Sequence, residues 1–222
     1  MLTYSGENIL QISIAKPVIG DKEKQAVMSV LDSGYLVQGA EVEKFEEAFT
    51  TYHGAKYGVG VNNGTSALIA MMMAHNIQTG DEVIIPSFSF FATASAVLSV
   101  GATPIFADIE PDTFCLSPEA AEASITSRTV AIMPVHLYGQ PARMNEFEAI
   151  CSKHNLILLE DSAQAHGAKI GNRFVGTYGT ASFSFYPSKN MTTGEGGMIL
   201  TNDEEIYRQL RMIRNQSSLI KI

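Results

Sequence analysis

Residues 57–75 read YGVGVNNGTSALIAMMMAH, and they show the strand–turn–helix pattern that predicts the fold of most of the chain. A short apolar strand leads into a Gly-Thr-Ser turn, and the apolar run after the turn has the length of a helix. The same order of strand and helix recurs downstream. Further strands are expected at 82–86, 104–107, 129–135 and 156–160, and further helices at 91–100, 118–124 and 145–154. Apolar strands alternating with helices predict an α/β fold, with a mostly parallel sheet covered by helices on both faces.

The two ends of the chain depart from this alternation. Helices are expected at 21–33, with Asp21 as the N-cap and Gly34 as the stop, and at 40–54, ending at Gly54. Toward the other end, strands are expected at 180–185 and 198–201 without a helix between them, followed by a helix at 203–214. We expect residues 1–16 to form an N-terminal arm and residues 17–222 to form one domain that is truncated at its C-terminal end.

Composition excludes several classes of protein. The chain has 222 residues, is 45% hydrophobic and carries a formal net charge of −8 without a Lys/Arg cluster, which argues against nucleic acid as a partner. Its two cysteines, Cys115 and Cys151, lack metal-ligand spacing, so we expect no metal site and a reducing cytoplasm as the location. No signal peptide and no apolar stretch long enough to cross a bilayer is apparent, so no membrane partner is expected.

The first of three polar loops at strand ends contains Gly64, Thr65 and Ser66. At the start of a helix, these residues present backbone N–H groups and two hydroxyls at the positive end of the helix dipole. Such a turn can hold a phosphate group. The alternative is that Thr65 or Ser66 only caps the helix.

The second loop, EDSAQAHGA at 160–168, follows the strand that looks most buried. A carboxylate there is costly unless it has a cationic partner, and a pyridinium nitrogen beside Asp161 would be one. Alternatively, Asp161 caps a turn or pairs with an arginine. Gln164 and His166 could equally be hydrogen-bonding residues of the core.

The third loop places Lys189 after an apolar strand, among small and hydroxyl residues and before the glycines of GEGG. Partial burial there favours the neutral amine, which can attack an aldehyde. A solvated surface charge is the alternative for any single lysine. Together the loops supply a phosphate site, an acid for a ring nitrogen and a reactive amine, as pyridoxal 5′-phosphate (PLP) requires. Phe88 or Phe90, after another strand end, could stack on the ring.

These stretches resemble the DegT–DnrJ–StrS family of PLP-dependent nucleotide-sugar aminotransferases, which have the aspartate aminotransferase fold (fold type I). The resemblance runs from about Pro17 to Asn215. Its motifs are SGYLVQG, FEEAF, NNGTSAL, GDEVIIPSFSF, GATPIFADI, PVHLYGQPA, EDSAQAHGA, SFSFYPSKN and TTGEGGMILTND. The match implies that the chain holds the large domain and lacks the small C-terminal domain. It also departs from the family at Gln216 and Ser217, where a histidine and a glycine are usual.

The resemblance implies a role for each matching residue. Lys189 would hold PLP as a Schiff base and move the catalytic proton, and Asp161 would pair with the pyridine nitrogen. Gln164 would lie by the ring or its phenolic oxygen. Gly64, Thr65, Ser66 and Ser184 would hold the phosphate. Phe90 would stack on the ring, with Phe88 the second choice, and the role of His166 stays open.

The implied reaction transfers an amino group from an amino acid, usually glutamate, to a keto-sugar linked to a nucleotide. It would serve cell-surface polysaccharide or secondary-metabolite sugar biosynthesis, and the family members are homodimers. Two alternatives are weighed against it. A truncated chain could bind PLP without catalysing a reaction. A Rossmann-type dinucleotide protein would fit the sheet, but no GxGxxG opens a helix here.

Overall fold

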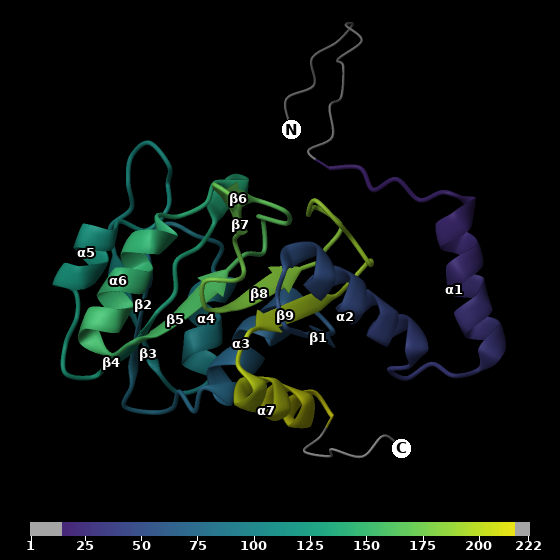
Figure 1. The fold of residues 1–222 in the computed structure, drawn as a ribbon, viewed down its shortest axis with the longest axis horizontal. Coiled ribbons are helices and arrows are strands. Elements are labelled where there is room, and N and C mark those ends of the chain that lie inside the picture. The colour runs from purple at the N-terminus through teal and green to yellow at the C-terminus, as the bar shows by residue number, and fades with distance from the viewer. Residues whose placement is uncertain (1–14, 216–222) are drawn as a thin grey trace, which may run out of the picture.

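The fold is known from a computed structural model, which describes residues 15–215 (Figure 1). The expected arm up to residue 14 and the departures at Gln216 and Ser217 lie outside the described residues. Within the described range, no helix is long and apolar enough to cross a membrane.

A seven-stranded sheet organises the molecule, in the order β1-β9-β8-β5-β4-β2-β3. The strands are β1 (Tyr57–Val61), β2 (Glu82–Pro86), β3 (Thr103–Ala107), β4 (Thr129–Ile132), β5 (Ile157–Asp161), β8 (Thr180–Ser184) and β9 (Gly197–Thr201). From β3 to β8 every pairing is parallel, and β9 is antiparallel to both of its neighbours. The prediction of a mostly parallel sheet is therefore confirmed.

Helices pack against both faces of the sheet, as predicted. On one face lie α3 (Gly64–Ala74), α4 (Ala92–Ser99) and α7 (Glu204–Arg214). On the other lie α2 (Ala40–His53), α5 (Pro118–Ala123) and α6 (Met144–His154). Apolar side chains from alternate strand positions fill the two cores, because neighbouring residues of a strand point to opposite faces.

This alternation decides what the ends of β5 and β8 present to each face. In β5, Leu159 packs in the α3–α4 core, whereas Leu158 packs against the α5–α6 core. Asp161 therefore shares the face of Leu159, and Glu160 points to the other face. In β8, Phe183 packs with α2, so Ser184 faces α3.

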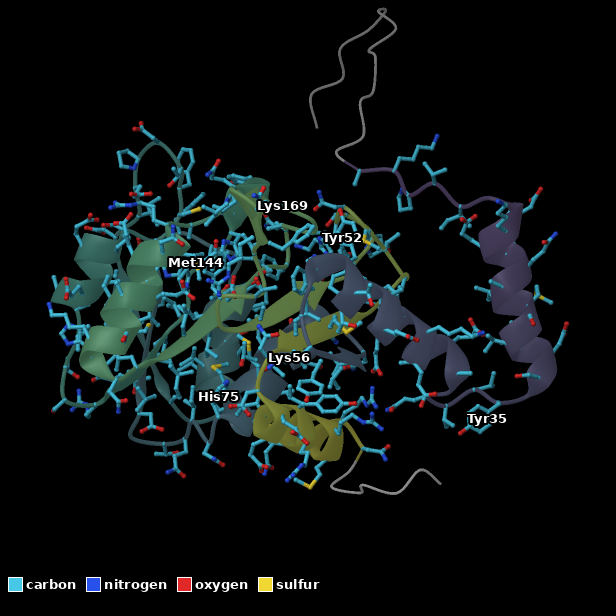
Figure 2. The ribbon with its side chains drawn as sticks, in the orientation of Figure 1. Tyr35, Tyr52, Lys56, His75, Met144 and Lys169 are labelled. Atoms are coloured by element: carbon cyan, nitrogen blue, oxygen red, sulfur yellow. The ribbon has the colours of Figure 1, made fainter. Side chains whose placement is uncertain are left out.

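Helix α1 (Asp21–Ser33) lies apart from the sheet, and none of its residues is buried (Figures 1 and 2). In Figure 2, the labelled Tyr35 lies just beyond this helix, well away from the sheet. The expected stop at Gly34 is confirmed, with φ of 68°. The expected N-cap is wrong by one residue. Gly20 is the N-cap, because its N–H is bound by the Glu23 carboxylate, and Asp21 is the first helical residue.

Three local features differ from the sequence-based expectation. Strand β4 ends at Ile132 rather than at residue 135, since Pro134 has no N–H to donate to a ladder. A small hairpin, β6 (Lys169–Ile170) with β7 (Arg173–Phe174), and a 3₁₀ turn, η1 (Leu137–Gly139), were not predicted. Strand β3 is at the edge of the sheet and is not fully covered, with Phe106 58% exposed.

Candidate functional site

The N-terminus of α3 lies at the end of β1 and is capped by Asn63. The Asn63 side chain accepts the Ser66 N–H at 2.7 Å, so the cap is neither Thr65 nor Ser66. The Ser66 N–H is therefore not free to bind a phosphate, although the predicted phosphate site assumed that it was. Gly64 and Thr65 come first in the helix and have no partner within it for their N–H groups. Thr65 is exposed, so its hydroxyl is accessible as well.

Gly64 packs directly against Ser184 at the end of β8. A Cβ atom on Gly64 would lie 2.7 Å from the Ser184 Cβ and 3.0 Å from its Oγ, so only glycine fits without a shift. The Ser184 Oγ accepts a long hydrogen bond of 3.4 Å from the Tyr186 N–H. Its own proton therefore remains available for donation to an anion. The structure thus brings Gly64 and Ser184 together, as the predicted phosphate site requires.

Asp161 is 4% exposed at the end of β5, on the α4 side of the sheet. Its Oδ2 accepts a hydrogen bond from the Thr93 hydroxyl at 2.9 Å, and its Oδ1 accepts the Ala163 N–H at 3.2 Å. The second contact means that Asp161 does cap a turn, as the alternative interpretation held. Neither partner is a cation, however, so a buried carboxylate remains without full charge compensation.

Burial raises the pKa of the Asp161 carboxyl above its ordinary value, and the hydrogen bonds from Thr93 and Ala163 offset only part of that rise. The charge of Lys189 acts on the same carboxyl and favours its ionised form. A protonated ring nitrogen placed beside Asp161 would act in the same direction. The electrostatics of this site therefore fit a cationic heterocycle.

Lys189 belongs to a loop that closes on itself at the end of β8. Phe185 donates its N–H to the Gly196 carbonyl at 2.9 Å and accepts the Thr193 N–H at 3.1 Å, which ties both ends of the loop together. The Lys189 N–H donates to the Tyr186 carbonyl at 2.9 Å. Lys189 is partly buried, and its charge acts on Asp161 and also on His166. The lysine and the acid thus face one site.

Phe90 precedes α4 by two residues and is 61% exposed, with its ring centroid 4.8 Å from that of Phe91. Three residues further along the same segment, Thr93 contacts Asp161. Phe88 instead lies against Phe114, with the ring centroids 6.0 Å apart. Of the two candidate aromatics, Phe90 is therefore the one joined through its own segment to the acid.

Gln164 accepts the backbone N–H of Tyr138 on its Oε1, at 2.7 Å. This contact settles which way the amide points, because only the oxygen of a Gln side chain can accept. The amide nitrogen, with its two N–H groups, is then the end left to a ligand. Such an end suits an acceptor such as a phenolic oxygen.

His166 lies in an aromatic pocket made by Phe183 and Phe185, with ring centroids 5.5 and 5.4 Å away. Neither ring nitrogen has a hydrogen-bond partner of normal geometry among the described residues, although the Ser184 backbone and the Asn190 side chain favour its protonated form. Burial outweighs them and lowers the pKa of His166 to about 4. A neutral His166 therefore lies next to the loop that carries Lys189.

Sequence reasoning missed a buried pair, Glu160 with His136. The Glu160 carboxylate is fully buried and accepts the Nε2–H of His136 at 3.1 Å. It also accepts three backbone N–H groups, from Gly176, Tyr178 and Gly179, at 2.7 to 2.9 Å. Burial, the largest influence, raises the pKa of Glu160, but the hydrogen bonds from His136 and the backbone outweigh it, so the pKa lies below its ordinary value. His136 follows an apolar strand, and this position could have drawn attention to it.

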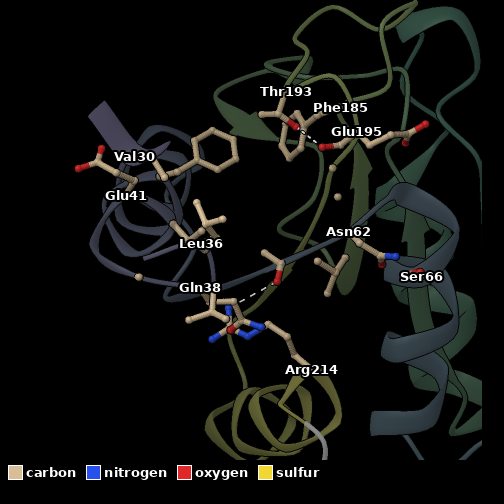
Figure 3. Close-up of a pocket in the computed structure, with 18 of the residues that line it drawn as sticks. Val30, Leu36, Gln38, Glu41, Asn62, Ser66, Phe185, Thr193, Glu195 and Arg214 are labelled. Carbon is tan, nitrogen blue, oxygen red and sulfur yellow. Dashed lines mark hydrogen bonds between the residues drawn. The ribbon is translucent and has the colours of Figure 1, made fainter. Parts of the chain in front are cut away.

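A large cavity lies elsewhere, between the α1–α2 segment and the β1 edge of the sheet (Figure 3). Its volume is about 1010 Å³, and its lining is mostly apolar, with Leu36 and Phe185 among the residues in Figure 3. Arg214 lies at its edge and donates to Glu46 and to the Gly60 carbonyl. Of the expected cofactor ligands, Ser66 alone lines this cavity. In residues 15–215, no group of three or more His, Cys, Asp or Glu side chains is arranged to hold a metal ion.

Comparison with known proteins adds independent evidence. Residues 17–221 match the model of the DegT/DnrJ/EryC1/StrS aminotransferase family. The chain is 43% identical to GDP-perosamine synthase of Caulobacter vibrioides, over 93% of this chain and 56% of that protein. It is 44% identical to a UDP-N-acetyl-3-dehydro-alpha-D-glucosamine 3-aminotransferase of Acidithiobacillus ferrooxidans, over 89% of this chain and 54% of that protein. The chain thus spans about half the length of the curated relatives it matches.

Solved structures show the same fold. DesV of S. venezuelae, in complex with a ketimine intermediate, matches with a TM-score of 0.86 and 43% identity, over 89% of this chain and 54% of that chain. The PLP-form of a putative sugar aminotransferase, Spr1654 of Streptococcus pneumoniae, matches with a TM-score of 0.87 and 29% identity, over 90% of this chain and 57% of that chain. The expected fold type is therefore confirmed.

Proposed function

The chain belongs to the DegT/DnrJ/EryC1/StrS aminotransferase family. From this premise we propose that it binds PLP and functions as a transaminase acting on nucleotide-linked keto-sugars. The observation that carries this proposal is the meeting of three groups at the ends of β5, β8 and β1. Asp161 is a buried acid without a full cationic partner, Lys189 acts on it electrostatically, and Gly64 leaves room at the start of α3.

We assign the residues as follows. The phosphate binds to the N–H groups of Gly64 and Thr65 and to the hydroxyls of Thr65, Ser66 and Ser184. Ser66 takes part through its side chain alone, since Asn63 holds its N–H. Asp161 would hold a proton on the ring nitrogen, Phe90 would cover one face of the ring, and the amide nitrogen of Gln164 would donate to the phenolic oxygen.

Bound PLP supplies an aldehyde and an electron-withdrawing ring that stabilises negative charge on a neighbouring carbon. Lys189 Nζ is the point of covalent attachment. With PLP and an amino-acid donor bound, the same Nζ would serve as the base that takes the proton from the donor's α-carbon and gives one to the carbon on the other side of the transferred nitrogen. Asp161, anionic beside the ring nitrogen, would keep that nitrogen protonated.

The donor in this proposal is glutamate, and the acceptor is a sugar nucleotide with a ketone on its ring. Two relatives with named activities, a GDP-perosamine synthase and a UDP-linked 3-aminotransferase, support that acceptor class. We further propose a homodimer and a cytoplasmic location, which fits the two buried free cysteines. Residues 1–16 and 17–222 remain our proposal for the arm and the PLP domain.

The first experiment mixes the chain with PLP and follows its absorbance into the visible edge. A band in the wild type that is absent from Lys189→Ala is expected, because the amine at residue 189 forms the covalent link. A band that persists in the variant contradicts the assignment of Lys189. Amino transfer from glutamate to a 4-keto nucleotide sugar then separates an active enzyme from a chain that only binds the cofactor.

A further inference from the structure

Tyr138 adopts a backbone conformation that non-glycine residues avoid. It lies in the turn η1 with φ of 56° and ψ of 18°, and its side chain is 71% exposed. A bulky residue in the left-handed region costs about 1 kcal/mol or more, and it persists only where its surroundings enforce it. The exposed ring buries little apolar surface that could offset this cost. The contacts that enforce the conformation therefore act on the backbone of the turn.

His136 supplies those contacts from one end of the turn. Its Nδ1 accepts the Ala142 N–H at 3.0 Å, so the ring bridges residues 136 and 142 and closes the loop that contains Tyr138. Because Nδ1 is an acceptor, the ring proton lies on Nε2, which donates to Glu160 at 3.1 Å. The His136 backbone N–H also donates to the Asp161 carbonyl at 3.0 Å.

Glu160 in turn keeps the His136 ring in place. Its carboxylate is 0% exposed, and the backbone N–H groups of residues 176, 178 and 179 occupy its remaining acceptor positions. A carboxylate with four donors has little freedom to rotate. Glu160 therefore joins β5, the loop of residues 136–142 and the segment 176–179 at one buried point.

The closed loop directs the Tyr138 N–H at Gln164. That N–H donates to Gln164 Oε1 at 2.7 Å and so turns the amide nitrogen away from Tyr138. A turn that relaxed to an ordinary conformation would move this N–H, and the Gln164 amide would then be free to rotate or to flip.

We propose that His136, held by Glu160, is a positioning residue, which through the Tyr138 turn makes Gln164 present its N–H donors to the phenolic oxygen of the cofactor. The inference rests on the proposed function, because it requires bound PLP. His136 itself touches neither the cofactor nor the substrate in this role.

Two pairs of variants separate the contacts. His136→Asn keeps an acceptor near the place of Nδ1 and loses the donor to Glu160, whereas His136→Gln keeps the donor and loses the acceptor. On the exposed turn, Tyr138→Pro removes the N–H that Gln164 accepts, and because proline cannot adopt φ of 56° it also breaks the left-handed turn while leaving the side chains of His136 and Glu160 unaltered. Tyr138→Gly is its matched control, since it loses the same ring but keeps the N–H and favours positive φ.

The readout is the pH midpoint at which the visible absorbance of bound PLP changes. A donor to the phenolic oxygen favours its anionic form, so loss of the donor raises this midpoint. We expect Gln164→Ala, both His136 variants and Tyr138→Pro to raise it by roughly 0.5 to 1 pH unit, the size of one net hydrogen bond. Tyr138→Gly should leave it unchanged. In a Gln164→Ala background, the His136 and Tyr138→Pro changes should add nothing.

The possible results distinguish the positioning role of His136 from the proposed function. A midpoint that does not respond to the His136 variants or to Tyr138→Pro overturns the inference, as does an equal shift in both backgrounds. If the His136 variants do not fold, the Tyr138 pair decides alone. Absence of a visible band in the wild type contradicts the proposed function, and the positioning role with it, whereas a band with an unresponsive midpoint contradicts the positioning role only.

Discussion

At the scale of single residues, the adjacent acids Glu160 and Asp161 show how one step along a strand separates two roles. Both are buried, yet the pKa of Glu160 lies below its ordinary value and that of Asp161 lies above it. Glu160 has four hydrogen-bond donors, including three backbone N–H groups, whereas Asp161 has a hydroxyl and one N–H. Glu160, with its hydrogen bonds satisfied by the protein, is structural, and Asp161, with fewer donors, is available to a ligand.

Asp161→Asn is therefore expected to stabilise the protein without cofactor and to weaken cofactor binding. A carboxyl whose pKa is raised by folding binds its proton more tightly in the folded chain, so its contribution to stability falls as the pH rises above about 3.9. Asparagine avoids that loss and can keep the contact with Thr93. Denaturant unfolding at pH 7 should show a higher free energy than the wild type, with the two converging in acid, and PLP affinity should fall roughly tenfold or more. A variant that loses stability at pH 7 would contradict this account.

His166 should make the protein sensitive to mild acid. Its pKa of about 4 in the fold lies below the ordinary value near 6.5, so the unfolded chain binds a proton that the folded chain does not. Stability is then full above the ordinary pKa and declines as the pH falls toward 4, by on the order of 3 kcal/mol for this residue. His166→Gln should flatten the free energy of unfolding between pH 6.5 and 4. Burial lowers the pKa of His53 and His75 too, so a smaller slope should remain. Parallel curves for variant and wild type would refute the assignment.

At the scale of elements, the close contact between α3 and β8 shapes the phosphate end of the site. Gly64→Ala would place a methyl group 2.7 Å from the Ser184 Cβ and force the helix start away from the strand. We expect a loss of roughly 1 to 3 kcal/mol in the free energy of unfolding, together with weaker PLP binding. The control is Gly60→Ala in β1, where the new methyl group would lie 3.4 Å from the nearest atoms of other residues, an ordinary contact distance. Equal effects of the two changes in denaturant titrations would show that the contact does not matter.

The elements themselves were largely predictable. The helices at 21–33, 40–53 and 145–154 and the strands at 57–61 and 82–86 appear within a residue or so of their expected bounds, because periodicity, glycine stops and apolar runs are local signals. The differences between expected and observed elements also have local causes. Pro134 shortens β4, and the short hairpin of β6 and β7 has too few residues to show a period.

At the scale of the whole molecule, α1 presents apolar side chains to solvent. Val27, Met28 and Leu31 are each more than half exposed and lie on one face of this helix, and the following residues Leu36 and Val37 are exposed as well. Contiguous exposed apolar surface of this kind usually marks a contact with another protein. It supports the proposed self-association.

Leu31→Glu should therefore weaken self-association, because it places a charge in the apolar face. Sedimentation velocity at several concentrations is the measurement, and a shift toward the monomer is expected in the variant. Lys22→Glu, on the opposite face of α1, is the control and should leave association unchanged. If both variants associate as the wild type does, α1 is not part of the interface.

The sequence by itself determined the fold class, the three polar loops and the choice of Lys189, Asp161 and Gly64, since strand periodicity, turn residues and motif spacing are properties of neighbouring residues. Only the tertiary structure decided that Asn63 caps α3, that Phe90 is joined to Asp161 through Thr93, and which way the Gln164 amide points. It also revealed the pairing of His136 with Glu160, 24 residues apart. The physical reason is that hydrogen bonds between distant segments depend on how strands and loops pack, which no local pattern encodes.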